Sequence, residues 1–337
     1  MSGEPNRALR LEHTYLALAL LPLAVVMLAD AMLNSFAFPT GSEATIEKHP
    51  SLHADATGRV YMATGFMLLV ASTATAAVFF VRKMGRLDRP SLAATIVVIV
   101  VSLIVTWAFF AVSNSVQTQE LLGQRLFCAA GSTPGGSINA GTEAAHESRA
   151  YLTGDSVPAN CLSERFKRFR ILLEIEKRML GIAVVAVVFG AIACLARLRG
   201  ANPDAKALAR FHRRQIADLN TILYISAFLL VSGLIFVSAF LHWPHYVIAG
   251  DAAARFKAHA DALVLFYGVS YSVLIASFYL PVLLLLTARL RASGADISDA
   301  GAQGLSFPEL MKVGAAIFAP MLTSMLGSVV NVPGVFG

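Results

Sequence analysis

One acidic side chain lies deep within a long apolar stretch and points to ion chemistry. Asp30 falls inside the apolar run of residues 14–36, and Asn34 lies one helical turn further on. A carboxylate in lipid costs about 2.5–3.5 kcal/mol, so it should face a bundle interior, a partner or water. Asp30, Asn34 and Asn114, which is expected at the same level, are therefore candidates for an ion pathway. Alternatively, the helix ends near Leu28 and leaves Asp30 in the wet interface.

In an oligomer whose axis runs near the first apolar segment, copies of Asp30 would form a ring. Such a ring attracts cations and disfavours anions, as acidic rings do in cation channels. The sequence thereby favours a cation-conducting pore over an anion pore.

Further titratable side chains gather around the end of the fifth apolar segment: His242, His245, His259, Asp251 and Asp261. Two histidines three residues apart can share a zinc ion on one helix face. Here Pro244 separates His242 from His245, and His-Trp-Pro-His-Tyr is more simply an interfacial turn. We therefore expect no metal at this position.

Three cysteines divide into a pair and a single residue. Cys128 and Cys161 share the long segment of residues 117–178, whereas Cys194 lies at the end of an apolar run. If the long segment is extracytoplasmic, its oxidising surroundings permit a disulfide between Cys128 and Cys161. Two unrelated thiols are the alternative. Cys194 is expected to pack as a small apolar residue.

Motifs for cofactor or nucleotide chemistry are missing from the sequence. We find no phosphate-binding Gly-Lys-Thr loop, dinucleotide glycine fingerprint, His-Glu-x-x-His zinc motif or Gly-x-Ser-x-Gly elbow. We therefore nominate no catalytic residue and no cofactor, and an enzyme is the least favoured class.

The composition indicates the kind of fold that positions these residues. The 337-residue chain is 56% hydrophobic and 14% charged, whereas soluble domains average about half apolar and about a quarter charged. Six stretches reach the ~20 apolar residues that a membrane-spanning helix needs. They are Thr14–Phe36, Tyr61–Val81, Ala93–Val116, Met179–Ala196, Thr221–Leu241 and Ala262–Thr287. Helices are expected because lipid leaves backbone groups without other partners, and the alternation of a barrel strand is absent.

The distribution of Lys and Arg predicts the orientation. With the N-terminus inside, fifteen Lys and Arg residues fall in inner segments and four in the two short outer loops. Basic residues favour the cytoplasmic side, whereas long loops such as residues 117–178 cross regardless of charge. Both termini are expected in the cytoplasm, with the bacterial inner membrane as the location. The net charge of +6 reflects this bias and indicates no nucleic-acid partner.

The first apolar run has some features of a signal peptide, namely Arg7 and Arg10 before it and Ala29-Asp30-Ala31 near its end. It is longer than the ~7–15 apolar residues of a cleaved signal. We expect it to remain as a span.

Two amphipathic segments flank the predicted spans. In residues 162–178, Leu162, Phe166, Phe169 and Leu173 repeat at helical spacing, so this segment should continue into the fourth span as one helix. Residues 306–330 begin with the capping box Ser306-Phe307-Pro308-Glu309, and Pro320 should kink the helix that follows. We expect this tail along the inner surface, with a seventh span as the alternative.

Small residues four apart indicate close helix packing within the bundle. The pairs are Ser72/Ala76, Ala186/Gly190 and Gly268/Ser272.

The sequence thus predicts an all-α integral membrane protein with a six-helix transmembrane bundle, an extracytoplasmic loop domain and a C-terminal amphipathic helix. The expected divisions are residues 1–116, 117–178, 179–290 and 291–337. A homo-oligomeric ion channel is the favoured function, and its partners are the lipid bilayer and further copies of the chain. The alternatives are a membrane scaffold that docks a protein through its outer loop, and an ion-coupled transporter.

Overall fold

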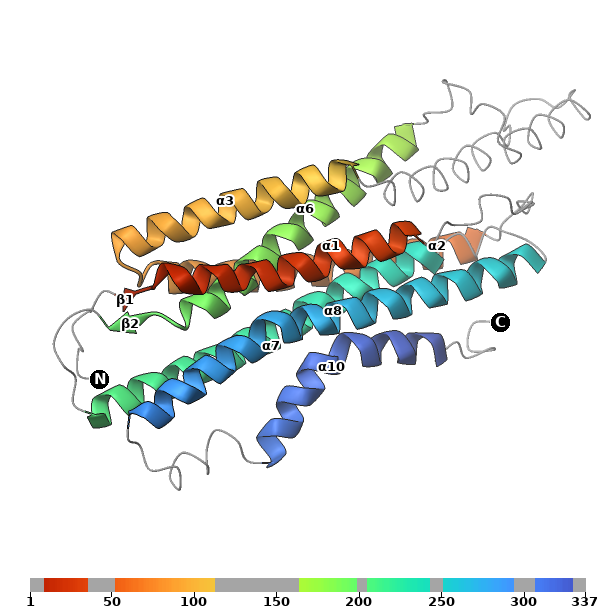
Figure 1. Ribbon diagram of the computed structural model, residues 1–337. Helices are drawn as coiled ribbons and strands as arrows, with labels where there is room; N and C mark the ends of the chain where they lie inside the picture. Colours follow the sequence, from red (N-terminus) through yellow and green to blue (C-terminus); the bar gives the residue numbers. More distant parts are fainter. Residues whose placement is uncertain are drawn as a thin grey trace, which may run out of the picture.

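The computed structural model describes residues 9–35, 52–112, 164–198, 205–242, 251–293 and 307–329, and these residues form an elongated bundle of helices (Figure 1). A short 3-10 helix, η1 (His13–Ala19), leads into α1 (Leu20–Ser35). The other helices are α2 (Leu52–Met84), α3 (Arg89–Val112), α6 (Glu164–Ala193), α7 (Ala205–His242), α8 (Asp251–Ala292) and α10 (Phe307–Val329). Two short strands, β1 (Leu9–Arg10) and β2 (Arg197–Leu198), pair in antiparallel fashion.

In the part of the chain that the structure describes, five helices are long and apolar enough to cross a membrane by length and composition. These candidate spans are His13–Leu33, Val60–Met84, Arg89–Ala108, Lys206–His242 and Lys257–Ala292. Each corresponds to a stretch predicted from the sequence. The remaining predicted span, Met179–Ala196, corresponds to a shorter apolar helix, Arg178–Ala193. The chain is therefore a multi-pass helical membrane protein.

Several helices are longer than the apolar segments they contain. At about 1.5 Å per residue, the 42 residues of α8 extend for about 63 Å, twice the ~30 Å hydrocarbon core. The ends of α8 therefore continue beyond the membrane. As predicted, α6 runs unbroken from the amphipathic segment into the apolar one, because no Pro or Gly interrupts residues 164–180.

Helix α7 forms the centre of the bundle and contacts α2, α6, α8 and α10. Its most apolar window is 56% buried, whereas the corresponding window of α3 is only 11% buried. The inward face of α7 is built from leucines that are at most 2% exposed: Leu219, Leu223, Leu229, Leu230 and Leu234. Because lipid is as apolar as leucine, these side chains stabilise the packing of α7 through close van der Waals contact rather than through removal from water.

Small residues let the helices approach closely, as their spacing predicts. A Cβ atom at Gly65 of α2 would lie 2.8 Å from the Cα atom of Phe236 in α7. Ser72 and Ala76, about two and three helical turns further along α2, are also buried. The α2–α7 interface therefore depends on side chains small enough to admit backbone contact.

The tail helix α10 packs against α8, whereas its position along the inner surface stays a prediction from its amphipathic pattern. Figure 1 shows α10 in two segments at an angle, and Pro320 lies within the helix. The backbone N–H of Met321 donates to Ser272 Oγ at 3.2 Å, and Ser324 packs on Gly268. Both α8 residues lie near the middle of the candidate span. The second half of α10 therefore inserts beside the bundle, because Gly268 and Ser272 leave room for it.

The strand pair was not expected from an all-α pattern. Leu9 pairs with Leu198 and Arg10 with Arg197, while the Leu9 N–H donates to the Arg86 carbonyl at 3.0 Å. The N–H of Asp88 donates in turn to the Leu9 carbonyl at 2.8 Å. The N-terminal segment thereby joins the α2–α3 turn to the segment after α6.

Part of the predicted organisation lies outside the described residues. The extracytoplasmic loop domain is one such part, since the structure describes nothing between residues 112 and 164. Cys128, Cys161 and Asn114 belong to that segment. The disulfide therefore stays a prediction.

Gly268→Ala tests the insertion of α10. A Cβ atom at position 268 would lie 2.9 Å from the Pro320 carbonyl oxygen, so we expect a loss of about 1–3 kcal/mol through overpacking. Gly314→Ala is the matched control, because nothing lies within 4 Å of its added Cβ atom and Ala favours helix by about 0.5–1 kcal/mol. Thermal unfolding in detergent should show a lower midpoint for Gly268→Ala and an equal or higher one for Gly314→Ala. Equal shifts in both variants would contradict the insertion.

Candidate functional site

The helix α6 ends inside the protein, which leaves buried carbonyl groups that need partners. Residues 191–196 are each at most 4% exposed. After Ala193 the chain turns through hydrogen bonds three residues apart, the first from Cys194 N–H to the Ala191 carbonyl at 3.0 Å. A helix end leaves its last carbonyls without helical partners, and a buried carbonyl without a partner is costly.

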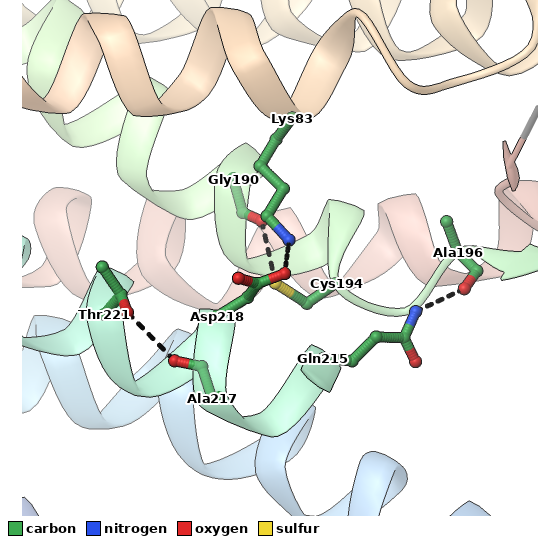
Figure 2. Close-up of polar contacts among 8 residues, drawn as sticks. All are labelled: Lys83, Gly190, Cys194, Ala196, Gln215, Ala217, Asp218 and Thr221. Atoms are coloured by element: carbon green, nitrogen blue, oxygen red, sulfur yellow. Dashed lines mark hydrogen bonds and ion pairs between the residues drawn. The ribbon is translucent and has the colours of Figure 1, made fainter. Parts of the chain in front are cut away.

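Side chains from two other helices satisfy this buried end. Gln215 of α7 donates from Nε2 to the Ala196 carbonyl at 2.6 Å, as Figure 2 shows. Arg289 of α8 donates from Nη1 to the Leu195 carbonyl at 2.6 Å. Its guanidinium also stacks 4.8 Å above the ring of Tyr15. Three helices and η1 are thereby held together at one end of the bundle.

An ion pair lies beside the same turn. Lys83 of α2 and Asp218 of α7 are in direct contact, and Figure 2 shows Cys194 next to them. The Lys83 side chain is 11% exposed and that of Asp218 is 38% exposed. The Cys194 thiol donates to the Gly190 carbonyl at 3.5 Å, which agrees with the packing role expected from the sequence. We refer to Lys83, Cys194, Gln215, Asp218 and Arg289 as the basic-end cluster.

Two further hydrogen bonds extend this polar region along α7. Tyr279 of α8 is fully buried and donates from its hydroxyl to Asn220 Oδ1 at 2.8 Å. The ring Nδ1 of His212 lies 3.2 Å from Gln215 Oε1. Because the Gln215 amide nitrogen is bonded to Ala196, its oxygen accepts and Nδ1 of His212 carries the proton.

A second polar contact lies at the opposite end of α7. Nε2 of His242 is 2.8 Å from Asp261 Oδ1 of α8, and its Nδ1 is 2.8 Å from the Ser238 carbonyl. The Ser238 hydroxyl also lies 3.4 Å from Nδ1, so both ring nitrogens of His242 have partners. His242 and Asp261 both belong to the titratable group that the sequence places around the end of the fifth apolar segment.

Residue spacing separates the Lys83–Asp218 ion pair from the His242–Asp261 contact along one helix, with Asp218 in its first half and His242 at its last residue. Asp218 and His242 are 24 positions apart in α7, which is about 36 Å along a helix. That distance exceeds the ~30 Å of a hydrocarbon core. Between these residues α7 buries seven leucine and isoleucine side chains, together with Ser226 and Ser232.

The predicted pathway residues are only partly described. Helix α1 continues through Asp30 to Ser35, and Asp30 is 9% exposed. Asp30 is therefore buried within the protomer, and the alternative of a helix that ends near Leu28 does not hold. Asn34 lies in α1, but its side chain is outside the described residues, as is Asn114. His245 is likewise outside them.

Sequence reasoning missed Lys83, Asp218, Gln215 and Arg289. One signal was present for Gln215: with His212, Leu219 and Ile222 it repeats at helical spacing. Polar residues on an otherwise apolar face require partners. No comparable signal paired Lys83 with Asp218, because they lie 135 positions apart.

The described residues bring ionisable side chains together at the basic-end cluster and at the His242–Asp261 contact. Within residues 9–35, 52–112, 164–198, 205–242, 251–293 and 307–329, no three His, Cys, Asp or Glu side chains group to hold a metal ion. Ionisable residues inside a helical membrane protein most often mark ion or proton pathways. No known protein family, curated protein or solved structure matches the chain.

A double-mutant cycle tests the ion pair of the basic-end cluster. Lys83→Met and Asp218→Asn, alone and combined, should show a coupling energy above that of an exposed pair, because Lys83 is largely removed from water. The matched exposed pair is Arg197–Glu12, with a distance of 2.8 Å and side chains 56% and 39% exposed.

The coupling energies of both double-mutant cycles are obtained from the free energies of unfolding of all variants in detergent. For the exposed pair Arg197→Met and Glu12→Gln should couple by about 0.2–1 kcal/mol. A coupling between Lys83 and Asp218 no larger than this value would show that the buried geometry adds nothing.

Proposed function

We propose that the protein is an ion-conducting membrane protein of pore type and that the described arrangement is its closed state. The pathway follows α7 within one protomer, between α2 and α8. The observation that carries this proposal is a pair of polar contacts that α7 makes 24 positions apart, the Lys83–Asp218 ion pair and the His242–Asp261 hydrogen bond. Each contact joins α7 to a different neighbour, so separation of α7 from α2 or α8 breaks it.

The packing between the two contacts supports a closed state. Leu229, Leu230, Leu234 and Ile275 are at most 2% exposed and fill the space along α7. Ion conduction requires polar groups or water along the path. Opening must therefore move α7 relative to its neighbours, and the two ionic contacts set the free energy of that movement.

A pathway within the protomer replaces the ring of Asp30 residues on an oligomer axis. The surface of α1 that a central axis would meet is apolar, with Leu20, Leu21, Leu28 and Met32 exposed. Asp30 lies on the opposite, buried face of the helix. The Asp30 carboxylate can therefore contribute to an ion pathway only if that pathway lies inside the bundle.

We further propose that the basic end of the bundle, where α2 ends and α7 begins, faces the cytoplasm. The excess of Lys and Arg there supports this orientation. The same orientation puts the N-terminus and Ser293 inside, and it puts Tyr61 of α2 outside.

Cysteine labelling tests the orientation. Ser293→Cys and Tyr61→Cys are introduced singly into a variant whose native cysteines, Cys128, Cys161 and Cys194, are replaced by alanine. An impermeant thiol reagent should label position 61 in intact cells and position 293 only after lysis. The reverse pattern would invert the orientation.

A membrane scaffold is the second candidate, and α3 is the observation that favours it. Its exposed face is uniformly apolar: Ile96, Val97, Val100, Val101, Ile104, Val105 and Trp107. Because so little of α3 is buried in the protomer, one complete face of this helix remains available for contact with another membrane protein or a second copy of the chain. A scaffold of this kind conducts no ions.

Liposome flux separates the two candidates. Because the two contacts close the pathway in series, Asp218→Asn or Asp261→Asn alone should raise cation flux little. The double variant should raise it by about tenfold or more, which corresponds to about 1.4 kcal/mol of lost closed-state stabilisation. Glu12→Gln, which breaks an exposed contact away from α7, should leave flux at the wild-type level.

Two results would overturn the pore proposal. One is a double variant that is folded and monodisperse but no more permeable than protein-free liposomes, which would favour the scaffold. The other is an equal increase in Glu12→Gln, which would attribute the leak to general loosening of the bundle.

A further inference from the structure

A shallow groove runs along the outer surface of the bundle between α2 and α7. Its volume is about 390 Å³, and its lining residues are Ala74, Thr75, Val78, Phe79, Arg82 and Ile225. Volumes of about 300–1,000 Å³ are typical of sites for small ligands. Phe79 and Ile225 are partly buried and form the floor, whereas the other four side chains are exposed.

The walls of the groove are apolar over most of its length. Thr75 is the one hydroxyl among the lining residues, and it donates to the Ala71 carbonyl of its own helix at 2.9 Å. The Thr75 hydroxyl proton is therefore not available to a ligand. A hydrocarbon chain fits such walls, because it requires no hydrogen bonds from them.

Arg82 gives the groove one charged end. The adjacent Lys83 is paired with Asp218, so that carboxylate is already neutralised. Among the residues that the structure describes, no acidic side chain pairs with the exposed Arg82 guanidinium. The end of the groove therefore carries an uncompensated positive charge.

Arg82 lies at the level along α2 where lipid headgroups are expected. It lies two residues before the end of the candidate span Val60–Met84, where apolar residues give way to the charged turn. Ala74, in contrast, lies about 12 Å deeper along the helix at about 1.5 Å per residue. The charged and apolar parts of the groove thus match the headgroup and acyl regions of one membrane leaflet.

We propose that this groove binds an anionic phospholipid. One acyl chain lies along Ala74, Val78, Phe79 and Ile225, and the headgroup phosphate accepts hydrogen bonds from Arg82. Arginine pairs with phosphate through two parallel hydrogen bonds, which a lipid phosphate can accept. The site does not depend on the proposed pore.

Native mass spectrometry in detergent tests this site with phosphatidylglycerol as the probe. Phosphatidylglycerol should bind at one saturable site, and phosphatidylcholine of equal chain length should bind at least about tenfold more weakly. Arg82→Gln removes the charge and Ala74→Leu fills the apolar part of the groove without changing charge. Each variant should weaken phosphatidylglycerol binding by about tenfold, the effect of losing about 1.4 kcal/mol.

Arg89→Gln is the matched control, because Arg89 is exposed at the same end of the bundle but does not line the groove. It should bind phosphatidylglycerol like the wild type. Both groove positions are exposed, and unfolding midpoints measured without lipid should match those of the wild type. Equal losses in Arg89→Gln would attribute binding to general surface charge and overturn the proposal.

Two other outcomes would also overturn it. Unchanged affinity in Ala74→Leu would show that the groove holds no acyl chain. Competition by glycerol phosphate as strong as that by phosphatidylglycerol would identify a site for a free phosphate instead. Failure of this site would leave the flux experiment unaffected, because Arg82 belongs to neither ionic contact of α7.

Discussion

The organisation of the bundle depends on one buried helix end. Helix α6 stops at Ala193 with its last residues removed from water, so its carbonyls must find partners in other parts of the chain. Gln215 and Arg289 supply them from α7 and α8. A carbonyl left unsatisfied there would cost about 1–3 kcal/mol. This requirement fixes the rotation of α7 and α8 about their axes, and with it the face that each helix presents to the core.

Once α7 is fixed, its two ends acquire their ionic contacts. The rotation that brings Gln215 to the end of α6 also brings Asp218 to Lys83, because these positions are one turn apart. Further along the same helix, His242 meets Asp261 of α8. The apolar length between them separates the contacts by more than a hydrocarbon core. One helix therefore couples two charged contacts that no single local motif contains.

The periphery of the bundle is held less tightly, and its surfaces face lipid. Helix α3 begins at Arg89 after the cap of Asp88, whose Oδ1 accepts from the Ser91 N–H at 3.1 Å, yet few of its residues are buried. The tail α10 reaches the middle of α8 only because Gly268 and Ser272 leave space. The groove beside Arg82 lies on the outer side of the contact between α2 and α7.

The sequence by itself determined the class of the protein and the position of its apolar helices. Apolar length and the placement of Lys and Arg are local properties, and each can be evaluated without knowing any partner. The kink at Pro320 and the unbroken α6 follow from local chemistry in the same way. Only the tertiary structure decided that Asp30 is buried, that α6 ends three residues early, and that Lys83 meets Asp218. Such pairings depend on the rotation and register of helices distant in sequence, and helical periodicity alone leaves both free.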